Sequence, residues 1–185
     1  PCKIAADFRI GRKFQGLNVF ENMTVAENLA LAAPVRRTVV SSFLRAAPKS
    51  VQENAERILE QTGLSEKRNF LACGLSHGER QWLEIGMLMM QDPKLMILDE
   101  PTAGMTEEET YRTGEMIQKL LNGRTVLVVE HDMNFVRQVA KTVTVLHMGK
   151  ILAEGPLSEI ENNPEVIRVY LKSNKAGKGN DHAGG

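Results

Sequence analysis

The 185-residue chain is 42% hydrophobic, enough apolar material for the core of one domain or of a domain plus a small lobe. Lysine plus arginine and aspartate plus glutamate both number 23, so no basic surplus argues for a nucleic-acid partner. The sequence contains no run of about 18 apolar residues and no charged-then-apolar leader, so we expect neither a membrane span nor a secretory signal. Cys2 and Cys73 lack a metal-binding spacing, which favours reduced thiols in the cytosol.

The N-terminal part of the chain predicts one short helix between irregular segments. Residues 1–20 mix charged and apolar side chains without a clear period. Thr24 and Glu27 then form a capping box, which predicts a helix that continues to about Ala32 and that Pro34 ends. The following stretch, 35–49, predicts a loop with room for one helical turn.

Two further capping boxes, at residues 50–53 and 76–79, each precede apolar residues at helical spacing. Gly63 is the expected C′ residue of the first of these helices. The second helix is expected to end before Asp92, which precedes a proline.

Beyond residue 92 the pattern changes to alternating strands and helices. It predicts a parallel α/β layer with strands at 95–99, 125–129 and 143–147 and helices at 106–122 and 133–141. A turn at residues 148–150 leads to a short strand and two short helices, at 151–154, 157–161 and 164–171. The remaining residues, 172–185, are rich in Lys, Gly and Asn and predict a disordered tail.

The predicted strand at 95–99 carries the strongest chemical signal. Its apolar residues predict a strand buried on both faces, as in parallel sheets. Two carboxylates, Asp99 and Glu100, follow at its carboxyl end, where open α/β sheets bind their ligands. Burial does not account for them, so we interpret them as residues of a phosphate site. The alternative is a strand that ends in a solvated acidic turn.

Two other segments predict contacts with phosphate. Ser76 and Gly78 lie at a predicted helix start, where unpaired N–H groups and the helix dipole favour anions. The alternative is that Ser76 is only an N-cap, worth about 1 kcal/mol. His131 directly follows the apolar run 125–129, and Asp132 is a plausible N-cap of the next helix. A single histidine in such a place is usually structural, which is the alternative for His131.

The order of these three elements, from about residue 10 to residue 171, resembles the ATP-binding subunit of ATP-binding cassette (ABC) transporters. The resemblance implies that Asp99 holds Mg²⁺, mostly through water, and that Glu100 acts as general base on the attacking water. It implies that His131 hydrogen-bonds the γ-phosphate of ATP. It also implies that Ser76 and Gly78 contact the γ-phosphate bound by the opposite subunit of a dimer.

The resemblance extends to the Q-loop and departs from the family elsewhere. Gln15 occupies the place of the Q-loop glutamine, which senses Mg²⁺ and the attacking water beside the docking site of the transmembrane partner; the alternative is an exposed loop amide. His77 stands where the family usually has glycine. Thr106 replaces a frequent aspartate of the D-loop, so we assign it no contact between subunits.

The P-loop motif G-x-x-x-x-G-K-[ST], which cradles phosphates, does not occur in the 185 residues. The resemblance therefore implies a partial P-loop NTPase core of α/β class, with a parallel sheet and a helical subdomain. We expect a truncated cassette that by itself binds ATP poorly and hydrolyses none. The expected regions are a Q-loop region, a helical subdomain with the signature motif, an α/β core part with Walker B and the switch histidine, and a tail, at 1–23, 24–92, 93–171 and 172–185.

By resemblance, the protein is the ATP-hydrolysing subunit of an importer. It would act as a head-to-tail homo- or heterodimer with transmembrane permease subunits, on the cytoplasmic face of the cell membrane, with ATP and Mg²⁺ and without nucleic acid. Residues 103–106, 129–133 and 164–171 resemble the branched-chain amino acid and urea importers, and the urea type more closely. The alternatives are a soluble ABC-type ATPase acting on ribosomes or DNA, and a non-catalytic interaction module.

Overall fold

The computed structural model describes residues 9–13, 19–34, 48–120 and 123–169. The chain divides into two compact units, Pro1–Gln138 and Val139–Gly185. The finer division into four regions stays a prediction. None of the helices in the described ranges is long and apolar enough to cross a membrane.

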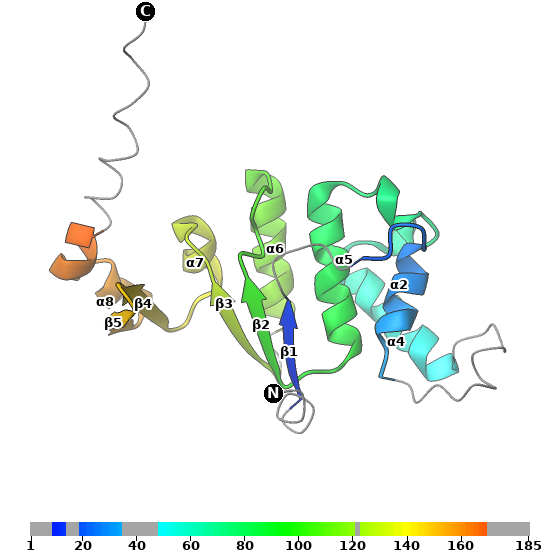
Figure 1. The fold of residues 1–185 in the computed structure, drawn as a ribbon, viewed down its shortest axis with the longest axis horizontal. Helices are drawn as coiled ribbons and strands as arrows, with labels where there is room; N and C mark the ends of the chain where they lie inside the picture. The colour runs from blue at the N-terminus through cyan, green and yellow to red at the C-terminus, as the bar shows by residue number, and fades with distance from the viewer. Residues whose placement is uncertain (1–8, 14–18, 35–47, 121–122, 170–185) are drawn as a thin grey trace, which may run out of the picture. The chain divides into compact units, whose positions relative to one another are not determined.

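The first unit contains a parallel sheet of three strands, in the order β1 (Ile10–Lys13), β2 (Leu95–Asp99) and β3 (Thr125–Val129). The three arrows lie side by side and point the same way in Figure 1. The strands at 95–99 and 125–129 confirm the predicted α/β class. β1 was not predicted, because its four residues have no alternating pattern and become a strand only through pairing with β2.

β1 lies close to helix α5 (His77–Met90) at Gly11. A Cβ atom added to Gly11 would lie 2.5 Å from Cδ1 of Leu88 and 3.2 Å from Cβ of Pro93. A side chain at this position would therefore require Leu88 to shift.

The prediction that the central strand is buried on both faces is wrong. Met96 and Leu98 are completely buried, whereas the alternate residues of β2 are only partly buried. On β3, Leu127 and Val129 share the face of Asp99 and are each 53% exposed. A continuous apolar run cannot reveal this difference, because it reads the same whether one face or both faces are covered.

Helices α2 (Val25–Ala32) and α4 (Lys49–Thr62) pack with α5. The capping box of α2 is confirmed, since the hydroxyl of Thr24 accepts from the N–H of Glu27 and the Thr24 N–H donates back to the Glu27 carboxylate. The box at residues 50–53 is wrong. The helix begins at Lys49, two residues earlier than a Ser50 cap would place it, with Pro48 as its N-cap and no side-chain cap.

The C-terminus of α4 is as predicted, because Gly63 takes the left-handed conformation with φ of 70°. The predicted loop at 35–49 lies largely outside the described residues, as do the last two residues of the helix predicted at 106–122.

Helices α6 (Glu107–Leu120) and α7 (Met133–Val139) complete the helical layer of the first unit. The indole N–H of Trp82 donates to the hydroxyl of the fully buried Thr113 over 2.8 Å, which joins α5 to α6. The side-chain amide of Gln138 donates to the carbonyl of Tyr111 over 2.9 Å, which joins α7 to α6.

The second unit contains the hairpin β4 (Val143–His147) and β5 (Lys150–Gly155), followed by α8 (Leu157–Ile160). The prediction that 143–147 joins the parallel layer is wrong: this strand pairs antiparallel with β5. Met148 and Gly149 both have positive φ, 49° and 75°, as a two-residue type I′ hairpin turn requires. Such a short connection permits only antiparallel pairing, since parallel strands need a crossover of about a dozen residues.

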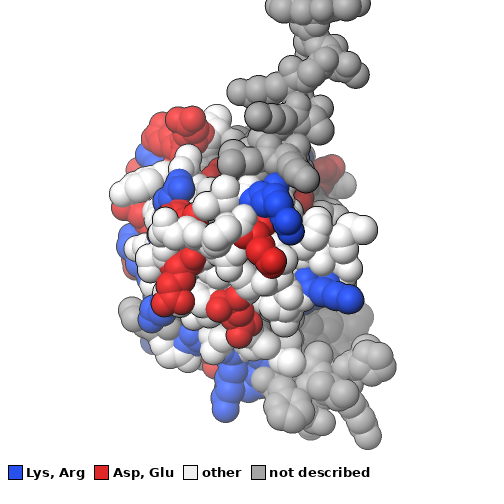
Figure 2. Space-filling model, turned by 90° about the vertical axis from the view of Figure 1, so that its left-hand side faces the viewer, with Lys and Arg blue, Asp and Glu red and all other residues white. Residues whose placement is uncertain are grey.

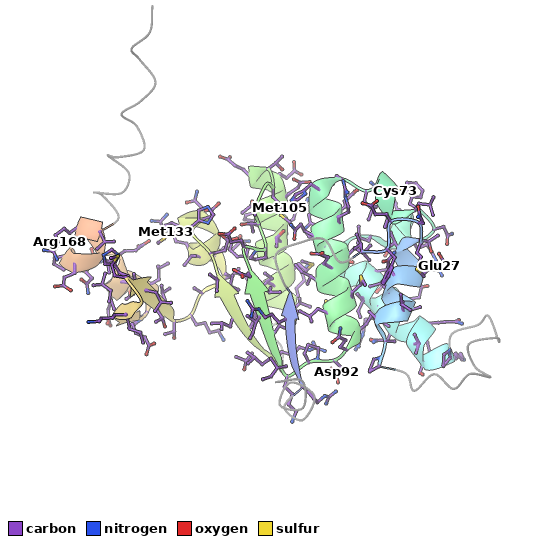
Figure 3. All side chains as sticks on the ribbon, viewed as in Figure 1. Glu27, Cys73, Asp92, Met105, Met133 and Arg168 are labelled. Carbon is purple, nitrogen blue, oxygen red and sulfur yellow. The ribbon has the colours of Figure 1, made fainter. Side chains whose placement is uncertain are left out.

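An ion cluster joins the amino ends of the three parallel strands. Asp92, which precedes β2 and is labelled in Figure 3, accepts from Arg124 over 3.1 Å and also pairs with Arg9. The hydrogen bond from Arg124 lowers the pKa of Asp92, burial acts in the opposite direction, and Arg9 lowers it further. A carboxyl with a depressed pKa stabilises the fold at pH values above the pKa of the unfolded chain, about 3.9, and this stabilisation is lost as the pH falls through the folded-state pKa.

We therefore expect Asp92→Asn to lower the stability of the protein at pH 7 and to have no effect at pH values below the folded-state pKa. The loss should stay below about 1 kcal/mol, because the side chain is mostly exposed and water screens the pair. Thermal unfolding midpoints of both proteins, measured from pH 7 down to pH 2, check this result. An equal difference at every pH would contradict the electrostatic explanation.

The surface mixes both charges, as the equal counts suggest. On the face drawn in Figure 2, basic and acidic side chains are interspersed and neither sign forms a continuous patch.

Candidate functional site

Asp99 and Glu100 lie where β2 ends, at the carboxyl edge of the parallel sheet. The Asp99 side chain is 26% exposed, and its Oδ2 lies 3.8 Å from Nη2 of Arg12 on β1. Asp99 is thus partly open to solvent on the less covered face of the sheet.

Glu100 has a backbone conformation that is unusual for a residue with a side chain. Its φ is 45°, in the left-handed region, and its N–H donates to the carbonyl of Val129 over 2.9 Å. Such conformations cost on the order of 1–3 kcal/mol and persist where the surroundings enforce them, often at functional sites. Here the bond to β3 contributes to that enforcement.

The structure brings His131 next to Glu100. Nδ1 of His131 lies 3.8 Å from Oε1 of Glu100, and the histidine side chain is 77% exposed. His131 occupies the turn between β3 and α7, and Oδ1 of Asp132 accepts from the N–H groups of Asn134 and Phe135, so Asp132 is the N-cap predicted for this helix. Met133 at the start of α7 and Met105 ahead of α6 both lie at the opposite end of the sheet from Asp92, as Figure 3 shows.

Ser76 is the N-cap of α5, and the capping box is confirmed. Its hydroxyl accepts from the N–H of Glu79 over 3.2 Å, and its own N–H donates to the Glu79 carboxylate over 3.0 Å. Burial alone would raise the pKa of Glu79, but hydrogen bonds from Lys67 and Ser76 outweigh it and hold the pKa below its usual value. Ser76 itself is exposed.

Gly78 has a packing reason to be glycine. A Cβ atom added there would lie 2.5 Å from Oε1 of Glu109, at the start of α6. The imidazole of His77 hydrogen-bonds the carbonyl of Ala103 through Nε2 over 2.9 Å. The start of α5 therefore contacts the turn that follows Glu100.

The two residues predicted to hold or sense Mg²⁺ are Gln15 and Asp99. Gln15 lies outside the described residues. Within the described ranges, no group of three or more His, Cys, Asp or Glu side chains could hold a metal. Asp99 alone still fits Mg²⁺, which takes one or two carboxylates and completes its shell with water and phosphate oxygens.

Three further residues at this edge were not predicted from the sequence: Arg12, Thr102 and Glu130. Glu130 directly follows the apolar strand β3, just as Glu100 directly follows β2. That placement could have identified Glu130 as a candidate site residue. Arg12 and Thr102 gave no such signal, because their significance depends on contacts across the sheet.

Comparison with known proteins identifies the family of the chain. The model of the ABC transporter family matches residues 4–103. The branched-chain amino acid transport ATP-binding protein LivG of Salmonella typhimurium is 37% identical over 180 residues, which cover 92% of this chain and 71% of LivG. The chain belongs to the ABC transporter ATP-binding family.

Further similarities support this assignment. The related transport ATP-binding protein BraF of Pseudomonas aeruginosa is 36% identical over 171 residues, which cover 86% of this chain and 66% of BraF. The solved structure of a nucleotide-free ABC cassette matches with a TM-score of 0.75 and 28% identity, over 90% of this chain and 70% of that one. This ABC chain therefore has the α/β cassette fold and belongs to a family of ATPases.

Proposed function

We propose that this ABC chain belongs to the ATP-binding and ATP-hydrolysing subunit that energises an importer. The observation that supports the proposal is the pairing of Glu100 and His131, 3.8 Å apart, at the carboxyl edge of the parallel sheet beside Asp99. This is the edge where open α/β sheets bind ligands.

In the proposed site each residue has one task. Glu100 orients the attacking water and accepts its proton, which is the work of a general base. His131 donates a hydrogen bond to the γ-phosphate from an exposed side chain. Asp99 holds Mg²⁺, mostly through water, and Gln15 senses the same ion; bound Mg²⁺ offsets the negative charge of the phosphates.

We propose that Ser76 and Gly78 act across a head-to-tail dimer of ATP-binding subunits. Ser76 is exposed at the amino end of a 14-residue helix, where N–H groups favour anions. The capping bond uses the Ser76 hydroxyl only as an acceptor, so the same hydroxyl can donate to a phosphate oxygen.

We propose that transmembrane permease subunits dock in a groove on the first unit and hold the chain at the periphery of the membrane, on its cytoplasmic face. The volume of this groove is about 510 Å³, and its lining includes the exposed Phe20 together with Leu31, Met87 and Leu88. Two lining residues, Arg12 and Phe20, flank Gln15 in the sequence. A groove with apolar lining residues suits a partner helix.

For the transported substrate, we propose branched-chain amino acids, on the basis of the 36–37% identity to LivG and BraF. Urea is the second candidate, because residues 103–106, 129–133 and 164–171 resemble the urea-type subunit. By resemblance, substrate choice resides in other subunits of the importer.

Removing this chain from its cell is expected to reduce high-affinity uptake of radiolabelled leucine to background, because import needs ATP hydrolysis. The measurement is initial uptake of leucine and of urea in cells with and without the gene, with restoration by the native gene as control. Loss of urea uptake alone would assign the subunit to urea. Unchanged uptake of both would contradict this import function.

A further inference from the structure

Glu130 is a buried carboxylate between two turns of the proposed site. It lies between β3 and His131, and its side chain is 2% exposed. A buried carboxylate is costly unless hydrogen bonds compensate it. The hydrogen bonds that Glu130 accepts therefore indicate its role in the structure.

The two oxygens of Glu130 face different turns. Oε1 accepts from the N–H of Thr102, over 3.1 Å, and from the Thr102 hydroxyl. Oε2 accepts from the N–H groups of His131 and Asp132, over 3.0 Å and 3.5 Å. Four donors thus converge on one side chain, which suits a carboxylate because both its oxygens accept.

The two turns that Glu130 joins carry the residues of the proposed chemistry. Thr102 lies two residues after Glu100, and the other end of the bridge is the backbone of His131 itself. Nδ1 of His131 also lies 3.7 Å from Oε2 of Glu130. The bridge therefore restrains the separation of Glu100 and His131.

We propose that Glu130 is a positioning residue of the ATPase site, acting through His131 and through the turn that follows Glu100. This inference rests on the proposed function. Small displacements of reacting groups are costly, since a misplacement of about 1 Å can reduce a rate by about 10²-fold.

The first test is Glu130→Gln, measured on the protein isolated with its permease from its own cells. Glutamine keeps the size of the side chain, but its NH₂ group must face either Thr102 or the His131 turn, so one end of the bridge loses its acceptor. We expect kcat for ATP hydrolysis to fall about 10- to 100-fold and KM for ATP to change less than about threefold.

Thr102→Val is the second variant, which removes only the hydroxyl and keeps the backbone N–H. It should lower kcat by a smaller factor, and Thr102→Ser should restore it. Thr113→Val is the matched control, because it also removes a buried threonine hydroxyl, the one that accepts from Trp82. It should lower the thermal midpoint and leave kcat unchanged.

A double-mutant cycle separates this inference from the proposed function. If Glu130 acts through His131, adding Glu130→Gln to His131→Ala should cost much less than Glu130→Gln costs alone. Unchanged kcat in both Glu130→Gln and Thr102→Val, or fully additive effects in the cycle, would overturn the positioning role. Unchanged hydrolysis in His131→Ala and Glu100→Gln would instead overturn the proposed function.

Discussion

Glu100→Gln is expected to reduce ATP turnover by about 10²- to 10⁴-fold, the usual contribution of a general base, while nucleotide affinity changes little. Glutamine has the shape of glutamate but cannot accept the proton of the attacking water. The backbone bond from residue 100 to the carbonyl of Val129 does not involve the side chain, so the turn should keep its conformation.

The measurement is steady-state hydrolysis of MgATP by the complete subunit isolated with its permease, combined with equilibrium binding of a fluorescent ATP analogue. Glu115→Gln is the matched control, since Glu115 is an exposed glutamate on α6 away from this turn. Hydrolysis at the native rate in Glu100→Gln would remove Glu100 from the role of base. Loss of nucleotide binding would show instead that it binds ATP.

His131→Ala is the second substitution with a large expected effect. We expect kcat to fall about 10²- to 10³-fold, the scale for loss of a single preorganised hydrogen-bond donor. Stability should change little, because the side chain is 77% exposed and the bond to Glu130 comes from the backbone N–H. This combination of an inactive and stable protein is the expected mark of a residue that contacts the phosphate.

Hydrolysis and thermal unfolding of the same preparation check this prediction. His147→Ala is its control, because His147 is an exposed histidine of the second unit. If His131→Ala hydrolyses ATP like the native protein, the histidine has no part in the reaction. If instead the thermal midpoint falls sharply, the effect on kcat would reflect folding.

Two of the three predicted capping boxes, at Thr24 and Ser76, mark the start of a helix, and the third, at Ser50, does not. Thr24 and Ser76 each accept from the N–H three residues on, as their spacing indicates. Ser50 has the same spacing to Glu53, but α4 begins at Lys49, so Ser50 lies inside the helix and cannot cap it. The spacing of a capping box therefore does not by itself show that the helix starts there, because the helix can begin before the first residue of the pattern.

Strand partners were the weakest part of the prediction. The strand at 143–147 was correctly located, yet it pairs with β5 because a two-residue turn at Met148 and Gly149 folds the chain back. β1 was missed because nothing within its own four residues distinguishes it.

Most of the helices, the strands β2 and β3, and the carboxylates and histidine of the proposed chemistry could be predicted from the sequence, because these depend on residues close together in the chain. The contact between Glu100 and His131, and the link that Glu130 makes between their turns, are visible only in the folded protein. Its parallel pairing of β2 with β3 brings residues about 30 positions apart to one edge. Contacts of that range arise from packing and leave no local pattern from which to predict them.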